Sequence, residues 1–341
     1  MQPPPSEPPR PPPRVRARVL RVALAVLISG GAVAFLAAQL DWRRALEALR
    51  AADIGWIAVA IAWSLAIQWG RGVRWTWLQP EPGLGINTAA IAVQTFYNRI
   101  APMRLGELTL PFLLRRHAGQ DATRTLVLLI VVRIVELAVL IGLLALSTLL
   151  RTGTENGGWL AVLVGLLAVI ALVLARFRAM MRLSLRVTRR VARWIRVDRV
   201  PLVGRALERI EQAMAGEAQL SGRRRAGLLV WTVVLQAMQI ASIDAILRAF
   251  AVDLDWLAVV QGTSVALAGP ALPLPSVGMV GTLEASWAFG FVWVGLDLET
   301  AILTGVATQV ITLAFAAVAA LPSWWYLLRR TAARTPPPSR S

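Results

Sequence analysis

The chain has 341 residues, of which 57% are hydrophobic, and its mean hydropathy is +0.60. It contains one histidine and no cysteine, which excludes a disulfide framework, thiol chemistry and a cysteine–histidine metal cluster. The net charge of +17 comes from 36 basic residues, all arginine, and their clustering between apolar runs indicates membrane topology more than nucleic-acid binding.

The chain begins with a proline- and arginine-rich segment, residues 1–18, that we expect to be a disordered cytoplasmic tail. An apolar run at about 20–40 follows. A cleaved signal peptide is the alternative, but the run is long for one and further spans follow it. We therefore interpret it as the first helix of a transmembrane domain over residues 19–330. Residues 331–341 are expected to form a second disordered cytoplasmic tail.

Six apolar runs are long enough for a helix to cross the hydrocarbon core, which takes about 20 residues. They lie at about 20–40, 54–70, 125–150, 159–175, 227–250 and 301–328. Two further apolar regions, 86–117 and 257–295, are interrupted by proline and glycine. The sequence therefore predicts an all-α polytopic membrane protein with about six full transmembrane helices and two broken, re-entrant helical elements.

The distribution of arginine predicts how the two broken regions meet the membrane, because cytoplasmic loops carry an excess of basic residues. If 86–103 crossed fully, the loop at 176–226, with fourteen arginines, would lie outside. If 86–117 instead enters the membrane from the cytoplasm and returns to it, and 257–295 enters from the outside and returns there, the arginine-rich loops all lie in the cytoplasm. Both chain ends are then cytoplasmic. Broken elements that enter from opposite sides are typical of inverted-repeat transporters, although no repeat is visible residue by residue.

Two arginines and two tryptophans follow the second apolar run, in the stretch RGVRWTWL. They are Arg71, Arg74, Trp75 and Trp77. A clamp for a lipid phosphate is one interpretation. An aromatic belt beside cytoplasmic arginines explains them without a function, and we prefer it.

The first broken region contains the polar stretch NRIAPMRLGEL. Charged groups at membrane depth are tolerated where they are buried in protein or line a wet cavity, so we expect cavity lining here. The arginines would bind a lipid phosphate, while Glu107 holds an arginine or carries a proton, ahead of a helix that begins near Thr109. Alternatively, Arg104 snorkels and Glu107 complements a helix N-terminus. The candidate residues are Asn98, Arg99, Pro102, Arg104, Gly106 and Glu107.

Further charged residues lie along the apolar runs. Arg133 and Glu136 are three residues apart and share one helix face, either as a structural ion pair or with Arg133 facing the cavity. Asp244 and Arg248, four apart, are expected to form a structural or interfacial pair. We expect His117 to be an exposed loop residue.

The basic segment at 176–226 interleaves arginines with apolar residues, as in RLSLRVTRRVARWIR. This pattern predicts an amphipathic helix on the cytoplasmic membrane surface, with RNA binding as the weaker alternative. We expect no nucleic-acid partner.

The second broken region, PLPSVGMVGTLEASW, interrupts the helix with prolines and glycines and then restarts it. Thr282 is a suitable N-cap for a half-helix that begins at Leu283. Glu284 falls in the first turn, where it either faces the cavity or only complements the helix dipole. The backbone-breaking residues are Pro273, Pro275, Gly278 and Gly281.

Four stretches together resemble the flippase-like membrane domain of the lysylphosphatidylglycerol synthase family, over about residues 15–330. They are RGVRWTWL, NRIAPMRLGEL, VVRIVEL and PLPSVGMVGTLEASW. The residues that match the two main motifs are Asn98, Pro102, Arg104, Gly106, Glu107 and Leu108, then Pro275, Gly278, Gly281 and Glu284. Met103 and Leu110 depart from the first motif. The resemblance implies translocation of aminoacylated phospholipids or lipid-linked sugars. In bifunctional members the aminoacyl-transfer domain follows the membrane region, whereas this chain stops after RRTAARTPPPSRS. We therefore expect no synthase activity here.

We therefore expect a multi-pass protein of the inner or plasma membrane that flips or scrambles a lipid with an anionic or modified headgroup. An aminoacyl-phospholipid or a polyprenyl-phosphate-linked sugar would be such a lipid. We expect no catalytic residues, metal or cofactor, and no Walker motif is present. One alternative is a lipid transferase with Glu107 or Glu284 as base. The other is a scaffold for a lipid-modifying enzyme or glycosyltransferase. The oligomeric state is open.

Overall fold

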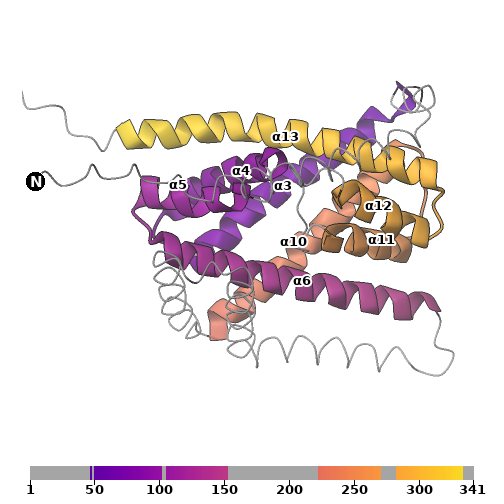
Figure 1. Ribbon diagram of the computed structural model, residues 1–341, viewed down its shortest axis with the longest axis horizontal. Coiled ribbons are helices and arrows are strands. Elements are labelled where there is room, and N and C mark those ends of the chain that lie inside the picture. The colour runs from indigo at the N-terminus through magenta and orange to yellow at the C-terminus, as the bar shows by residue number, and fades with distance from the viewer. Residues whose placement is uncertain (1–46, 48–49, 102–104, 153–221, 270–281, 333–341) are drawn as a thin grey trace, which may run out of the picture.

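The computed structural model describes residues 47, 50–101, 105–152, 222–269 and 282–332, and every regular element in these ranges is a helix (Figure 1). The predicted all-α architecture is confirmed for this part of the chain. Several predictions lie outside it: the tails at 1–18 and beyond 332, the runs at 20–40 and 159–175, and most of the basic segment. The same holds for Pro102, Arg104, Pro273, Pro275, Gly278 and Gly281.

Three described helices are long and apolar enough to cross a membrane. They are α6 (Ala122–Thr152), α10 (Gly222–Ala249) and α13 (Leu298–Ala332). Each coincides with one of the apolar runs predicted at 125–150, 227–250 and 301–328. The number of spans in the whole chain stays a prediction.

Helix α3 (Ile54–Leu78) begins where the second apolar run begins, with Asp53 as N-cap. The Asp53 side chain accepts hydrogen bonds from the backbone of Gly55 and Trp56. The prediction that the helix ends near residue 70 is wrong, because it continues for two more turns. These turns bury Arg74 and Trp75, which are 5% and 3% exposed, so the expected aromatic belt is wrong for both.

Each broken region forms a pair of packed helices, which we call hairpin 1 and hairpin 2. Hairpin 1 consists of α4 (Gly83–Ile100), the 3-10 turn η1 (Leu105–Leu108) and α5 (Thr109–Ala118). Hairpin 2 consists of α11 (Trp256–Ala268) and α12 (Thr282–Trp293).

The starts of the two second arms agree with the sequence. Helix α5 begins at Thr109 as predicted, and Pro111 sits in its first turn, where a missing N–H removes no helical bond. Helix α12 begins at Thr282, one residue before the predicted start. Helix α5 ends at Gly119, whose positive φ of 71° lets its N–H turn back to the carbonyls of the last turn.

The described helices repeat one order, a long helix, a hairpin and a long helix, first over α3 to α6 and then over α10 to α13. Helices α3 and α10 pack antiparallel, since the Asp53 N–H donates to the Ala249 carbonyl at 2.9 Å while Arg223 lies over the Trp77 ring. The second half is therefore inverted relative to the first. The halves also interlock, because α13 packs on α4 and α6 packs on α11. The hairpins lie at opposite ends of the molecule (Figure 1).

Two apolar clusters flank the centre of the molecule. One joins Trp75 of α3 to Leu110, Leu114 and neighbouring residues of hairpin 1 and α6. The other surrounds Trp287 and Phe291 of α12, whose ring centroids are 4.7 Å apart. Each hairpin thus has its own packed core.

His117 is not an exposed loop residue, as was expected. It belongs to the last turn of α5 and is 6% exposed. The helix continues past the predicted loop, and α13 packs against it, bringing the backbone of Leu327 close to the imidazole.

Candidate functional site

A cavity of about 210 Å³ lies between the tips of the two hairpins. The end of α4 contributes Asn98 and Arg99, and the end of α11 and the start of α12 contribute Leu267 and Leu283. Long helices of both halves complete the wall. The remaining lining residues are Ser64, Arg71, Thr95, Arg133, Glu136, Leu137, Leu140, Gln236, Gln239, Ser242, Ile243, Ile246, Trp287, Thr308 and Thr312.

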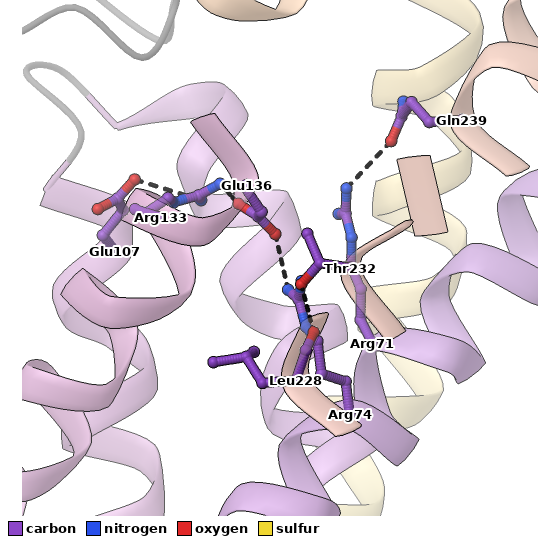
Figure 2. Close-up of polar contacts among 8 residues, drawn as sticks. All are labelled: Arg71, Arg74, Glu107, Arg133, Glu136, Leu228, Thr232 and Gln239. Atoms are coloured by element: carbon purple, nitrogen blue, oxygen red, sulfur yellow. Dashed lines mark hydrogen bonds and ion pairs between the residues drawn. The ribbon is translucent and has the colours of Figure 1, made fainter. Parts of the chain in front are cut away.

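Glu136 stands at the centre of a chain of ion pairs along this cavity (Figure 2). One of its carboxylate oxygens accepts from Arg74 Nη2 at 2.7 Å, and the other accepts from Arg133 Nη1 at 2.8 Å. Arg133 Nη2 lies 3.3 Å from the Glu107 carboxylate of η1. The predicted contact of Arg133 with Glu136 is therefore present, and so is the predicted contact of Glu107 with an arginine.

Local helix geometry explains this order. Arg133 and Glu136 are one turn apart on α6, so their side chains leave the same face. Helix α3 brings Arg74 to the far side of Glu136, and α10 holds the guanidinium through Thr232 Oγ1 at 3.3 Å. The Thr232 hydroxyl donates in turn to the Leu228 carbonyl, which fixes its oxygen toward Arg74 (Figure 2). All four residues of the chain of ion pairs belong to the first half, and the second half contributes Thr232, which holds Arg74.

Arg71 lies one turn before Arg74 and also faces the cavity. Its guanidinium donates to the Gln239 side-chain carbonyl of α10 at 3.2 Å (Figure 2). No carboxylate lies within 4.0 Å of it in the part of the chain that the structure describes. Arg71 is therefore a cavity cation with a neutral partner.

From the sequence we preferred a membrane belt for Arg71 and Arg74 over the alternative of a phosphate clamp, and so did not count them as site residues. A signal was available. Ile67, Arg74 and Leu78 repeat at helical spacing, and all three are buried. That spacing indicates a helix face that continues through the arginines into the protein interior.

A smaller cavity of about 50 Å³ adjoins the first and shares Arg71, Asn98 and Glu136 with it. Three buried polar atoms at its wall have no hydrogen-bond partner among the described residues: Asn98 Oδ1, Arg74 Nε and Trp75 Nε1. A polar space of this size is large enough for water, which needs about 10–15 Å³ per molecule. Buried groups without protein partners are the sites where such water is expected.

The structure brings several other predicted residues to this region. Arg99 of α4 donates to Gln309 of α13 at 2.9 Å, which is a further contact between the halves. Gly106 is buried against the end of α4, where an added Cβ would lie 2.5 Å from the Tyr97 carbonyl carbon. Glu284 lies in the first turn of α12, and its side chain is outside the description.

The predicted pair of Asp244 and Arg248 is confirmed, with Nε 2.9 Å from Oδ2. Arg248 also lies 5.5 Å from the Trp56 ring centroid and 3.6 Å from Asp253. Neither member of the pair lines the cavity. Within the described ranges, no cluster of three or more histidine, aspartate or glutamate residues could hold a metal.

A family model described as the lysylphosphatidylglycerol synthase TM region matches residues 22–320. The chain belongs to this family. Membership in the lysylphosphatidylglycerol synthase transmembrane family shows a membrane protein with a lipid-related function. The match extends over α3, α6, α10 and both hairpins, and over α13 as far as residue 320. Comparisons with curated proteins and with solved structures gave no match.

Proposed function

We propose that this protein moves a lipid with an anionic or modified headgroup between the two leaflets of a membrane. The headgroup passes through the cavity between the hairpin tips, and the acyl chains stay in the bilayer. The protein acts as a transporter and not as an enzyme. The observation that carries the proposal is an excess of arginine in a cavity between two hairpins that enter from opposite ends.

Charge is the first support. Arg71, Arg74, Arg99 and Arg133 meet at or beside the cavity, against the carboxylates of Glu107 and Glu136, among the described residues. Arginine at membrane depth is unfavourable without compensating negative charge. A phosphate supplies that charge and accepts two parallel hydrogen bonds from one guanidinium. The cavity is therefore suited to an anionic headgroup.

Size is the second support. Pockets that enclose whole drug-sized ligands measure about 300–1,000 Å³. The cavity here, at about 210 Å³, is smaller than that range and suits a headgroup without its acyl chains. The Arg133 side chain is 45% exposed, so a headgroup can reach it from the cavity.

The contacts between the halves support a rocking mechanism. Arg71 with Gln239 and Arg99 with Gln309 each join the first half to the second through a neutral amide. A hydrogen bond to a neutral group is weaker than one to a carboxylate, so a phosphate competes well for Arg71. The Glu136 carboxylate keeps Arg74 and Arg133 in place while the halves move. Bound headgroup thus shifts the population between two arrangements of the halves.

The two ends of the molecule differ in charge, and we use this difference to propose its orientation. One end of the molecule is rich in arginine. Helices α5 and α13 finish there, and α10 begins there. This end carries Arg115, Arg116, Arg124, Arg223, Arg224, Arg225, Arg329 and Arg330. The opposite end carries Asp53, Asp253, Asp255, Asp297 and Glu299. Basic residues mark the cytoplasmic face, so hairpin 1 enters from the cytoplasm and both chain ends lie there, in an inner or plasma membrane.

Leaflet exchange of labelled phospholipids in proteoliposomes tests the proposal. We expect wild-type protein to exchange an anionic phospholipid, and Arg133→Ala and Glu107→Gln each to lower the rate about tenfold or more. Glu81→Gln is the matched control, because this exposed carboxylate lies 4.0 Å from Arg124 and away from the cavity. Folded wild-type protein that exchanges no lipid, phospholipid or polyprenyl phosphate, would contradict the proposal.

A further inference from the structure

We propose that the smaller cavity binds one halide ion, chloride, and that this ion competes with an anionic headgroup for Arg71. The described residues that line this cavity belong to α3, α4, α5 and α6, so the site lies within the first half, beside the path proposed for the headgroup. The competition rests on the proposed function, whereas the binding of the ion does not.

Buried donors are the first evidence. The indole Nε1 of Trp75 and the Nε of Arg74 are buried, and neither has a hydrogen-bond partner among the described residues. Both side chains line the smaller cavity and are absent from the described lining of the larger one. Each of these atoms carries one N–H and accepts no hydrogen bond, so only an acceptor can satisfy it. A halide ion accepts from several donors at once.

Charge is the second evidence, and it favours an anion over water alone. Among the described residues that line the smaller cavity, three are arginines and one, Glu136, is a carboxylate. Glu136 pairs with Arg74 and Arg133, and Glu107 pairs with Arg133 as well. Arg71 has a neutral amide as its partner. Three cations thus meet two carboxylates, and one monovalent anion balances the difference.

The size and the walls of the cavity are the third evidence. Its volume is about 50 Å³, and a water molecule, which is little smaller than chloride, needs about 10–15 Å³. The space therefore admits the ion together with a water molecule, which can donate to the unpartnered Asn98 Oδ1. A phosphate with its glycerol substituents needs more room. Apolar walls suit a weakly hydrated halide, and they come from Ile91, Leu110, Leu129 and Val132.

Arg71 links the two cavities, because it lines both of them. A halide in the smaller cavity balances the same positive charge that attracts a headgroup phosphate into the larger one. Once either anion is bound, the other loses that attraction and is repelled by the first, and the low dielectric strengthens the repulsion. Chloride therefore inhibits the exchange of an anionic lipid.

Binding of radioactive chloride to the purified protein in detergent tests the site. We expect wild-type protein to bind one ion in gluconate buffer, because gluconate is too large for a cavity of this volume. Trp75→Phe keeps an aromatic ring without the indole N–H, and Arg71→Gln removes the excess charge. Each should weaken binding about tenfold or more. Trp77→Phe is the matched control, because Trp77 lies on the same helix and is absent from the described lining of both cavities.

Folded wild-type protein that binds no chloride would overturn the inference. Unchanged binding by Trp75→Phe or by Arg71→Gln would also overturn it, since the ion would then lie elsewhere, and either variant decides this if the other does not fold. Glu284→Gln tests a further carboxylate, which follows the cavity-lining Leu283 and whose side chain is outside the description. Binding by Glu284→Gln and not by wild type would show that Glu284 already balances Arg71, against the inference.

Lipid exchange tests the competition. Exchange of phosphatidylglycerol in proteoliposomes is measured in chloride and in gluconate at equal ionic strength. At a chloride concentration about ten times its measured Kd, we expect exchange to be about tenfold slower than in gluconate, because the unoccupied fraction of one site falls by about that factor. Trp75→Phe should exchange the lipid equally fast in both salts.

The same measurement separates failure of the competition from failure of the proposed function. Wild-type exchange that is equally fast in both salts would contradict the competition and leave lipid transport standing. No exchange in either salt, by protein that binds chloride, would contradict lipid transport and leave the halide site standing.

Discussion

Glu136 joins residues that are far apart in the sequence. It binds Arg133 on its own helix and Arg74 from a position 62 residues earlier, and its side chain is 16% exposed. Removing one member of a buried ion pair leaves the other charges uncompensated, which is more damaging than never having the pair. This residue therefore has a role in stability as well as in the proposed transport.

Glu136→Gln removes the shared charge and retains the shape of the side chain. We expect the free energy of unfolding to fall by about 3–5 kcal/mol, because Arg74 and Arg133 lose their common partner. Chemical denaturation in detergent, followed by tryptophan fluorescence, measures it. Glu81→Gln removes an exposed carboxylate and should change stability by less than about 1 kcal/mol. Equal effects of the two substitutions would show that the buried chain of ion pairs does not stabilise the fold.

At this scale the sequence predicted contacts between near neighbours. The pair of Arg133 and Glu136 follows from helical spacing alone, as does the pair of Asp244 and Arg248. The contact of Arg74 with Glu136 depends on how α3 packs against α6, and nothing local in the sequence specifies that. Arg71 was missed for the same reason, because its role depends on Gln239 in the other half.

Each hairpin depends on close approach of its two arms. In hairpin 1, η1 packs on the last turn of α4 at Gly106, where a Cβ would lie 2.6 Å from Asn98 Cα. In hairpin 2, a Cβ on Gly290 would lie 2.6 Å from the Gly262 carbonyl. Backbone cannot yield as a flexible side chain can, so glycine is required at both points.

Gly106→Ala should therefore displace η1 from α4 and move Glu107 away from Arg133. We expect lipid exchange to fall about tenfold or more and the midpoint of thermal unfolding to drop. Gly222→Ala is the matched control, because a Cβ there meets nothing within 4 Å. Normal exchange by the Gly106 variant would show that the tip of hairpin 1 does not have to be placed this closely.

The start of α13 offers a test of pH dependence outside the membrane-spanning helix. Asp297 accepts a hydrogen bond from the Thr300 N–H at 2.9 Å, and this bond lowers the pKa of its carboxyl. A lowered pKa stabilises the fold above the unfolded value, about 3.9, and the contribution disappears as pH falls through the folded value. We expect Asp297→Ala to lose about 1 kcal/mol at pH 7 and progressively less below about pH 4. The free energy of unfolding of wild type and variant, measured at pH 7 and below about pH 4, tests this. A difference that stays constant with pH would contradict the capping role.

Sequence interpretation did well for elements whose signals are local. The starts of α5 and α12 follow from proline, glycine and capping residues in the next few positions. The end of α3 was placed too early, because two arginines in an apolar context were taken as a loop. His117 was misplaced for a similar reason, since the helix and its cover by α13 depend on tertiary packing.

The described helices form two inverted halves that interlock, with α13 on hairpin 1 and α6 on hairpin 2. The distribution of arginine among the loops predicted two hairpins that enter the membrane from opposite sides. The antiparallel packing of α3 with α10 agrees with that arrangement. The interlocking could not be predicted, because no repeat is visible in the sequence. It means that neither half can move without changing the walls of the cavity.

The absence of cysteine allows a direct test of orientation. Glu81→Cys lies in the turn between α3 and α4, and Asp253→Cys lies in the turn between α10 and α11, where Asp253 is 88% exposed. We expect a membrane-impermeant thiol reagent to label Asp253→Cys in intact cells and Glu81→Cys only after the membrane is opened. Labelling of both from the same side would contradict the inverted arrangement.

Leaflet exchange in protein whose cavity is filled tests the central claim most directly. Ser64→Trp places a large side chain in the cavity without changing charge, and Val310→Trp places the same side chain on the outer face of α13, where Val310 is 61% exposed. With both variants folded, we predict that Ser64→Trp exchanges phosphatidylglycerol at least about tenfold more slowly than wild type, while Val310→Trp is unchanged. Equal exchange by all three proteins would show that the headgroup does not cross the membrane through this cavity.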